Sequence, residues 1–255
     1  MEQRPSNPHP TGQVSLVRAL SKLGLATRSE ARALIEAGRV TIDGRVVLDP
    51  GKGVVPEQAR IEIAGRITER FERVVVMLNK PAGVVSTRRD PEGRRTVYDC
   101  LGGLEAHVVP VGRLDAASAG LLLFTNDTRL ADSLTDPSNG IPRVYLVTVR
   151  GRVSGPTLSM LLAGLVDRGE RLHAHTATVR KASGRETHLV VELRQGKNRE
   201  IRRLFAAAGH EVTRLKRVSF GNLELRDLAP GAWRYVTEEE LATELGEVST
   251  RSSRS

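Results

Sequence analysis

The segment "VGRLDAASAGLLLFTND", from Val111 to Asp127, decides how the larger part of the chain is interpreted. Arg113 and Asp115 stand directly before an apolar run, "AGLLLF", which predicts a buried strand. An unpaired ion taken out of water is very costly, so this charged pair is either a solvated turn or a functional site. On these residues alone, the simpler interpretation is a turn aspartate that bonds to its own backbone.

The composition limits the class of protein. With 255 residues and a hydrophobic fraction of 39%, the chain predicts one full-size domain and a smaller one. No window is long and apolar enough for a membrane span, and the first residues lack the apolar core of a signal peptide, so we expect a cytoplasmic protein without membrane contact. The single cysteine, Cys100, excludes an intramolecular disulfide and a thiolate zinc cluster. His173 and His175 have strand spacing and favour a solvated sheet face, so we expect no metal.

The charge points to an anionic partner. The formal net charge is +9 at pH 7, and nucleic acid is favoured over a membrane because no long basic amphipathic helix is evident. Aromatic residues make up only 3% of the chain, which argues against a platform of several stacked bases and draws attention to Tyr145. Residues 1–13 and 243–255 are polar and are expected to be flexible tails.

Residues 14–64 predict a small helical and hairpin domain. Leu16, Ala19 and Leu20 have the spacing of one buried helix face, and Gly24 can end that helix. Thr27 and Glu30 form a capping box for a second helix, which Gly38 ends. Asp43-Gly44 between alternating residues then predicts a hairpin.

A basic surface accompanies this small domain. Its cations are either ordinary solvated helix charges or an RNA-binding face, and they are Arg18, Lys22, Arg28, Arg32 and Arg39. The segment "RALSKLGLATRSEARALIEAGRVTIDGRVV" resembles the RNA-binding module of the ribosomal-protein S-four type, although Thr27 stands where serine is commoner and Asp43 where asparagine is commoner. The resemblance favours the RNA-binding interpretation.

A second basic segment lies near the C-terminus. "LRQGKNREIRRLFAAAGHEVTRLKR" predicts a helix that begins near Asn198, with Ile201, Leu204, Phe205 and Ala208 on one face. Three arginines are expected on the opposite, exposed face: Arg199, Arg202 and Arg203. An arginine on a rigid helix is a good partner for a carboxylate or a phosphate.

Four segments in this order resemble the bacterial ribosomal RNA pseudouridine synthases of the RsuA and RluB type. They are "NKPAGVVST", "VGRLDAASAGLLLFTND", "RVYLV" and "QGKNREIRRLF", and the resemblance extends over residues 15 to 240, including "LAPGAWRYVTEEEL". It implies conversion of uridine to pseudouridine in ribosomal RNA without a cofactor. The "NREIRRLF" form is closer to the branch that acts on the large subunit.

The resemblance also assigns residues. It places the catalytic aspartate at Asp115, the active-site tyrosine at Tyr145 and the arginine that pairs with the aspartate at Arg202; Arg143 stands where the family usually has lysine. An ionised Asp115 can act as a nucleophile toward the sugar or the ring, or as a base, and an arginine beside it favours that form. Tyr145 can stack on the extruded base, and its hydroxyl can assist removal of the final proton. Candidate backbone contacts around the nucleotide are Lys80, Arg113, Arg143, Lys197, Arg199 and Arg203.

Two alternatives remain. A glycosidase needs two carboxylates around the scissile bond, and Glu200 is the only tempting partner for Asp115 in these motifs. A non-catalytic ribosomal RNA-binding or ribosome-assembly protein would keep the fold, but it gains little from a carboxylate that faces phosphates.

The expected fold is α+β. We expect a helix–helix–hairpin RNA-binding domain over residues 14–64 and a catalytic domain of the pseudouridine synthase fold over residues 70–242, with a mixed, largely antiparallel sheet and flanking helices. The expected partner is ribosomal RNA or an assembling ribosomal subunit, and a monomer is the default expectation.

Overall fold

The computed structural model describes residues 13–23, 25–26, 28–55, 59–64, 66–67 and 73–245. The expected tails lie almost entirely outside these residues, as do Gly24 and Thr27, which were expected to end one helix and begin the next. The chain divides into two compact units. The first contains Met1–Val74 with Glu105–Val109 and Thr125–Arg129, and the second contains Val75–Leu104, Pro110–Phe124 and Leu130–Ser255.

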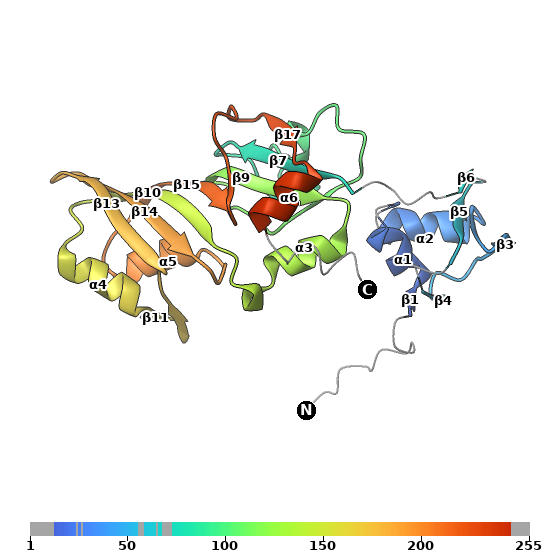
Figure 1. The fold of residues 1–255 in the computed structure, drawn as a ribbon, viewed down its shortest axis with the longest axis horizontal. Coiled ribbons are helices and arrows are strands. Elements are labelled where there is room, and N and C mark those ends of the chain that lie inside the picture. The colour runs from blue at the N-terminus through green and yellow to red at the C-terminus, as the bar shows by residue number, and fades with distance from the viewer. Residues whose placement is uncertain are drawn as a thin grey trace. The chain divides into compact units, whose positions relative to one another are not determined.

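The first unit consists of two short helices and short strands, drawn in blue in Figure 1. Its elements are β1 (Val14–Ser15), α1 (Leu16–Lys22), α2 (Arg28–Glu36), β2 (Val40–Ile42), β3 (Arg45–Val46), β4 (Gly53–Val54), β5 (Ile61–Ile63) and β6 (Arg66–Ile67). β3, β2, β5 and β6 form one sheet in that order, and β1 pairs with β4. The predicted helix–helix–hairpin order is therefore confirmed.

Local sequence signals explain this unit. Leu16, Ala19 and Leu20 are fully buried in one apolar cluster, as their helical spacing predicts. Gly38 has a φ of 69°, and its amide donates to the carbonyl of Ile35, which ends α2 with a left-handed residue. Asp43 and Gly44 both have positive φ, 49° and 78°, which matches the two-residue turn that was predicted for the hairpin.

The second unit is built on a mixed sheet. Its elements are β7 (Val75–Lys80), β8 (Val109–Pro110), β9 (Ala119–Thr125), α3 (Thr128–Thr135), β10 (Arg143–Arg150), α4 (Gly155–Ala163), β11 (Leu165–Asp167), β12 (Glu170–Leu172), β13 (Thr176–Ala182), β14 (Glu186–Leu193), α5 (Glu200–Ala207), β15 (Val212–Phe220), β16 (Leu223–Glu224), β17 (Trp233–Tyr235) and α6 (Glu238–Leu245), with short 3-10 helices at Tyr98–Cys100 and Pro137–Asn139. The main path of the sheet is β13-β14-β10-β15-β9-β7-β17. β13, β14, β10 and β15 are antiparallel neighbours, whereas β15 and β9 are parallel.

The segment from Val111 to Asp127 forms the junction of this sheet. β9, which was predicted as a buried strand, pairs with β15 through Ala119 with Lys216 and Gly120 with Arg217. A Cβ atom on Gly120 would lie 2.0 Å from the carbonyl oxygen of Arg217, so only glycine permits this approach. The loop that carries Asp115 ends directly at this junction.

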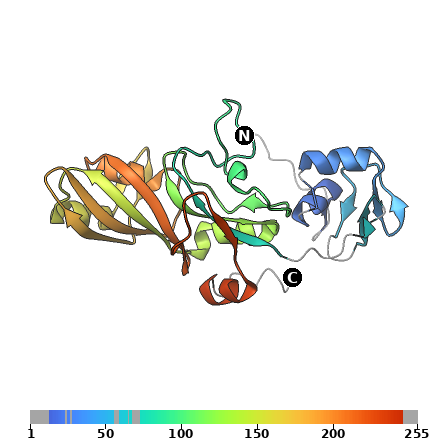
Figure 2. The same ribbon diagram turned by 90° about the horizontal axis from the view of Figure 1, so that it is seen from above.

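Helices α4 and α5 lie along one side of the strands β13, β14, β10 and β15 (Figure 1), and Figure 2 shows these four strands side by side. Val147 on β10 and Leu189 and Val191 on β14 are buried. Within the described part of the chain, no helix is long and apolar enough to cross a membrane.

Candidate active site

A cavity of about 160 Å³ in the second unit contains Asp115. The loop before β9, the strands β10 and β15, and the start of α5 contribute its walls. Five of the expected catalytic and RNA-binding residues line it beside Asp115: Arg113, Arg143, Tyr145, Lys197 and Arg199. The fold thus brings together side chains that are up to 86 positions apart in the sequence.

The Asp115 loop is held by hydrogen bonds from neighbouring segments. Ser86 Oγ donates to the carbonyl of Leu114 at 2.6 Å and accepts from the amide of Leu114 at 3.2 Å. The amide of Gly83 donates to the carbonyl of Ala116 at 2.7 Å. Within the loop, the amide of Ser118 donates to the carbonyl of Asp115 at 3.0 Å. The carboxylate is therefore carried by a rigid turn and not by a solvated one.

Lys80 supports the same loop from inside the protein. Its side chain is fully buried, and Nζ donates to the carbonyls of Ser118 at 2.7 Å, Pro81 at 3.0 Å and Ala116 at 3.4 Å. Burial lowers the pKa of Lys80 to about 8, against the opposing effects of Cys100 and Asp115. The expectation that Lys80 contacts the RNA backbone is therefore wrong, because its ammonium is enclosed by backbone carbonyls.

Two arginines lie beside the Asp115 carboxylate. Arg199 Nη1 donates to Asp115 Oδ2 at 3.2 Å, and Arg202 Nε lies 4.0 Å from the same oxygen. Arg199 precedes α5 and has a φ of 48°, a left-handed conformation that is uncommon for a residue with a side chain. The family resemblance assigned the pairing to Arg202, but in this structure Arg199 makes the direct hydrogen bond.

Arg202 connects two backbone segments as well. Its Nη1 donates to the carbonyl of Val212 at 2.8 Å, and its Nη2 donates to the carbonyl of Ala117 at 3.2 Å. It thereby joins β15 to the Asp115 loop next to the place where β9 and β15 meet. Burial lowers the pKa of Arg202, although its guanidinium still carries a charge at neutral pH.

The expected exposed face of three arginines on α5 is only partly correct. The side chain of Arg199 is 51% exposed, whereas those of Arg202 and Arg203 are 16% and 15% exposed. Arg203 forms ion pairs with Asp167 and Glu170, the latter at 2.6 Å. Both carboxylates come from the β11–β12 hairpin, which helical periodicity alone does not reveal, so Arg203 has protein partners where RNA phosphates were expected.

Tyr145 lies on β10, where it pairs in register with Val191 of β14 and Arg217 of β15. The ladder with β15 shifts between Val144 and Tyr145, so the strand is irregular at this residue. Tyr145 is buried and lines the same cavity as Asp115.

Buried arginines form another wall of the cavity. Arg143 donates to the carbonyls of Leu134 and Arg194, and Arg217 Nε donates to the carbonyl of Leu121 at 2.7 Å. Both guanidinium groups lie against the ring of Phe220, at 4.9 and 5.3 Å from its centroid. Arg143 is buried but lines the cavity, so its expected contact with RNA stays a prediction. Sequence reasoning missed Arg217, since nothing in a strand pattern marks a cation as buried.

The remaining predicted residues around the cavity differ in exposure. Arg113 is exposed at the rim, and Lys197 Nζ donates to the carbonyl of Arg171 at 2.7 Å. Glu200 is buried; its Oε2 accepts from the amide of Lys197 at 3.0 Å, and burial raises its pKa. Glu200 thus organises the start of α5. Among the described residues there is no cluster of three His, Cys, Asp or Glu side chains that could hold a metal ion.

The expected RNA-binding cations of the first unit lie mainly on its surface. The exposed residues among them are Arg18, Arg28, Arg32 and Arg39. Arg32 has an exposed ion pair with Glu36, and the side chain of Lys22 lies outside the described part of the chain.

Comparison with known families matches both units. Residues 74–207 match the RNA pseudouridylate synthase family, and residues 14–59 match the S4 domain. The first match includes Asp115, Tyr145 and the whole of α5.

Individual relatives extend this likeness over most of the chain. Ribosomal large subunit pseudouridine synthase B of Bacillus subtilis is 35% identical over 228 residues, which cover 89% of this chain and 93% of that protein. The protein of the same name from Escherichia coli is 38% identical over 234 residues, with coverage of 89% and 79%. A solved structure described as a pseudouridylate synthase has a TM-score of 0.62 at 26% identity and covers 91% of this chain and 99% of its own. The family match and these relatives establish that the chain belongs to the RNA pseudouridine synthase family.

Proposed function

We propose that this protein converts a uridine of ribosomal RNA, in the large subunit, to pseudouridine, with Asp115 as its catalytic carboxylate. Membership of the RNA pseudouridine synthase family supports the reaction, and the names of the relatives in Bacillus subtilis and Escherichia coli support the substrate. The observation that carries the role of Asp115 is its position in a cavity, on a rigid turn, with Arg199 bonded to its carboxylate.

The reaction is an isomerisation. The glycosidic bond between the sugar and uracil N1 breaks, a bond between the sugar and uracil C5 forms, and the proton on C5 leaves while N1 gains one. No electron is gained or lost overall. A carboxylate suits such a sequence because it can act as a nucleophile toward the sugar or the ring, or as a base.

The neighbours of Asp115 have roles that follow from their chemistry. Arg199 donates a hydrogen bond to the Asp115 carboxylate and Arg202 lies 4.0 Å from it, so both orient this group. Tyr145 stacks on the extruded uracil, and its hydroxyl assists the departure of the C5 proton. Lys80 and Arg202 act as positioning residues, since each holds backbone carbonyls of the Asp115 loop.

Binding of the surrounding RNA offsets the extrusion of the target base, which costs a few kcal/mol. The S4 domain supplies exposed arginines for this purpose, and Arg28 and Arg39 are examples. Around the cavity, Arg113 and Lys197 contact the backbone of the extruded nucleotide, because both line its walls.

We also infer that the protein works as a monomer in the cytoplasm. A single polypeptide contributes the whole cavity around Asp115, and ribosomal RNA is the substrate that its relatives' names indicate. Light scattering during size-exclusion chromatography should give the mass of one chain, 27.8 kDa. A stable dimer would contradict this inference.

The function is tested by incubating the purified protein with unmodified ribosomal RNA of both subunits. Pseudouridine is mapped by carbodiimide treatment and primer extension, with Asp115→Asn beside the wild type. We expect one new stop in large-subunit RNA with the wild type and none with Asp115→Asn. Asp132→Asn is the matched control, because Asp132 is exposed on α3 and lies outside the cavity.

Three other results would contradict parts of the proposed function. Modification only in small-subunit RNA would overturn the substrate. Tight RNA binding by both proteins without any modification would favour a ribosome-assembly factor. An Asp115→Asn protein with full activity would remove Asp115 from the reaction.

A further inference from the structure

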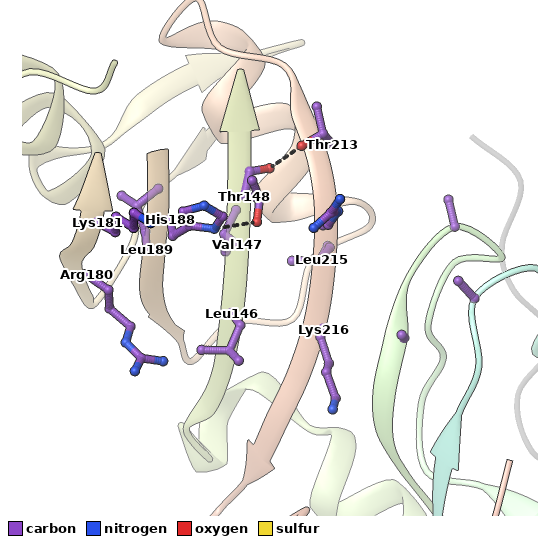
Figure 3. Close-up of a pocket in the computed structure, with 14 residues that line it drawn as sticks. Leu146, Val147, Thr148, Arg180, Lys181, His188, Leu189, Thr213, Leu215 and Lys216 are labelled. Atoms are coloured by element: carbon purple, nitrogen blue, oxygen red, sulfur yellow. Dashed lines mark hydrogen bonds between the residues drawn. The ribbon is translucent and has the colours of Figure 1, made fainter. Parts of the chain in front are cut away.

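A second and larger cavity lies in the catalytic unit, outside the walls of the Asp115 cavity. It is a groove of about 740 Å³ on the strands β13, β14, β10 and β15 (Figure 3). Ala82, Ala117 and Ala119 line it from the side of β7 and β9. All its lining residues belong to strands or loops, and Leu215 is the only one that it shares with the Asp115 cavity.

Strand register brings distant cations together in this groove. Lys181, His188, Thr148 and Arg214 form one row across four adjacent strands, and in the neighbouring row Leu146 lies opposite Lys216. Three strand spacings of about 4.8 Å separate Lys181 from Arg214, so the row is roughly 14 Å wide. Figure 3 shows the side chains of Arg180 and Lys216 on either side of Leu146.

An irregularity in β13 adds a further positive charge. The ladder between β13 and β14 shifts between Val179 and Lys181, which leaves Arg180 as an extra residue. Such a β-bulge disturbs the usual alternation, and both Arg180 and Lys181 line the groove. A regular strand would send two consecutive side chains to opposite faces of the sheet.

The groove is positively charged and has no partner for that charge. It is lined by Arg180, Lys181, Arg214 and Lys216, with no Asp or Glu among its lining residues. None of these four side chains makes an ion pair or a side-chain hydrogen bond within the described part of the chain. By contrast, Arg199, which precedes α5, and Arg203 on α5 both have carboxylate partners. Four unpaired like charges on one face repel one another, and an anionic ligand relieves that repulsion.

The groove also borders the catalytic loop. Ala117 lies two positions after Asp115, and Ala119 pairs with Lys216. A chain of phosphates in the groove would therefore lie next to the loop that carries Asp115. No Phe, Tyr or Trp side chain lines the groove, and His188 is its only ring with a π face, so backbone contacts are favoured over base stacking.

We propose that this groove binds the sugar–phosphate backbone of the substrate RNA beside the target uridine, through Arg180, Lys181, Arg214 and Lys216. The identity of the RNA rests on the proposed function, but the binding does not depend on catalysis. The groove gives affinity for the strand near the nucleotide, in addition to the contacts of the S4 domain.

The test is the salt dependence of binding to unmodified large-subunit ribosomal RNA transcribed in vitro. A variant with Arg180→Gln, Lys181→Gln, Arg214→Gln and Lys216→Gln is compared with the wild type at several KCl concentrations. Each lost phosphate contact lowers the slope of log K against log salt by about 0.7 to 0.9, so a decrease of roughly 3 to 4 is expected. Affinity should fall more than about tenfold at 0.1 M salt.

Two control variants separate the groove from general charge and from misfolding. Arg152→Gln with Arg185→Gln removes exposed charges outside the groove, and its slope should stay close to that of the wild type. A variant that exchanges each groove arginine for lysine, and each lysine for arginine, keeps the charge and should keep the slope. If the exchange variant lost the slope as well, the cations would serve the fold, and the proposal would be overturned.

Pseudouridine formation by the wild type and Asp115→Asn, measured on the same RNA, distinguishes the two proposals. If the wild type forms no pseudouridine, the proposed function fails, while the slope still reports whether the groove binds RNA. An unchanged slope in the glutamine variant overturns the groove proposal even if the enzyme is active. The groove proposal is also overturned if the glutamine variant binds RNA normally but no longer binds ribosomal proteins. The groove would then be a protein-binding surface.

Discussion

Arg199 Nη1 donates a hydrogen bond of 3.2 Å to Asp115 Oδ2, from a backbone conformation with a φ of 48°. Arg202 Nε lies 4.0 Å from the same oxygen, but its two terminal nitrogens bond to carbonyls of Val212 and Ala117. The two arginines therefore divide two tasks. Arg199 supplies an exposed charge to the carboxylate, while Arg202 fixes the loop that carries it.

Substitution of the two arginines should separate these tasks. Arg199→Ala removes a half-exposed ion pair of up to about 1 kcal/mol, so we expect a loss of about fivefold in the single-turnover rate. The free energy of unfolding should fall by no more than about 1 kcal/mol, because the ion pair is half exposed. Single-turnover pseudouridine formation and urea unfolding measure the two quantities.

Arg202→Ala should have a larger effect on both measurements. It leaves two carbonyls without their donor, which predicts a loss of about 2 to 4 kcal/mol in the free energy of unfolding. A displaced Asp115 loop should lower the rate by about 100-fold. Equal effects of the two substitutions on stability would contradict the division of tasks.

Lys80 predicts an unusual pH dependence. Its pKa of about 8 means that the ammonium loses its proton as the pH rises through 8, and a neutral amine has two donors for three carbonyls. We therefore expect the single-turnover rate to fall above about pH 8. In Lys80→Met the rate should be about 100-fold lower, without this inflection.

The effect of Lys80 on stability has the opposite sign. In the unfolded chain the lysine has its ordinary, higher pKa, so between the two values the unfolded state binds more protons than the folded state. The contribution of this group to stability therefore rises with pH in that window. A wild-type rate that falls together with the melting temperature would indicate general unfolding and not deprotonation of Lys80.

Local patterns predicted much of this molecule. The helical spacing of Leu16, Ala19 and Leu20 and the Asp43-Gly44 turn depend on near neighbours in the chain, and the structure contains the elements that they predict. The apolar run after Asp115 likewise forms the buried strand β9. These patterns can be recognised in the sequence because apolar residues on a buried face recur with the period of the helix or strand.

Local patterns do not predict whether a long cationic side chain points into the protein or into solvent. Lys80, Arg143 and Arg217 all lie inside the protein on backbone carbonyls, although each belongs to a residue type that is usually exposed. Their partners come from loops and strands distant in sequence. The basic groove was missed for the same reason, because the register of four strands brings Lys181 and Arg214 into one row.

Tyr145 offers a test of stacking against proton transfer. Tyr145→Phe keeps the ring and removes the hydroxyl, so we expect an unchanged KM and a kcat lower by about 100-fold if the hydroxyl assists removal of the C5 proton. Tyr145→Leu removes the stacking surface too and should raise KM. Steady-state kinetics on the transcribed RNA measure both constants.

The two Tyr145 variants also show whether this residue only stacks on the base or also assists proton removal. A Phe variant with the wild-type kcat would restrict Tyr145 to stacking. Because Tyr145 is buried between β14 and β15, unfolding of both variants must be measured, and only folded protein enters the comparison.

Gly120→Ala should break the junction of the sheet. The added Cβ would lie 2.0 Å from the carbonyl oxygen of Arg217, and the residue has a φ of 104°, so both sterics and backbone conformation oppose it. We expect a loss of more than about 4 kcal/mol in the free energy of unfolding, measured by urea denaturation. Gly184→Ala is the control, because nothing lies within 4 Å of its Cβ position and its φ is not in the left-handed region. Since Gly120 joins β9 to β15 beside the Asp115 loop, a folded Gly120→Ala protein with normal activity would show that the carboxylate does not need this junction.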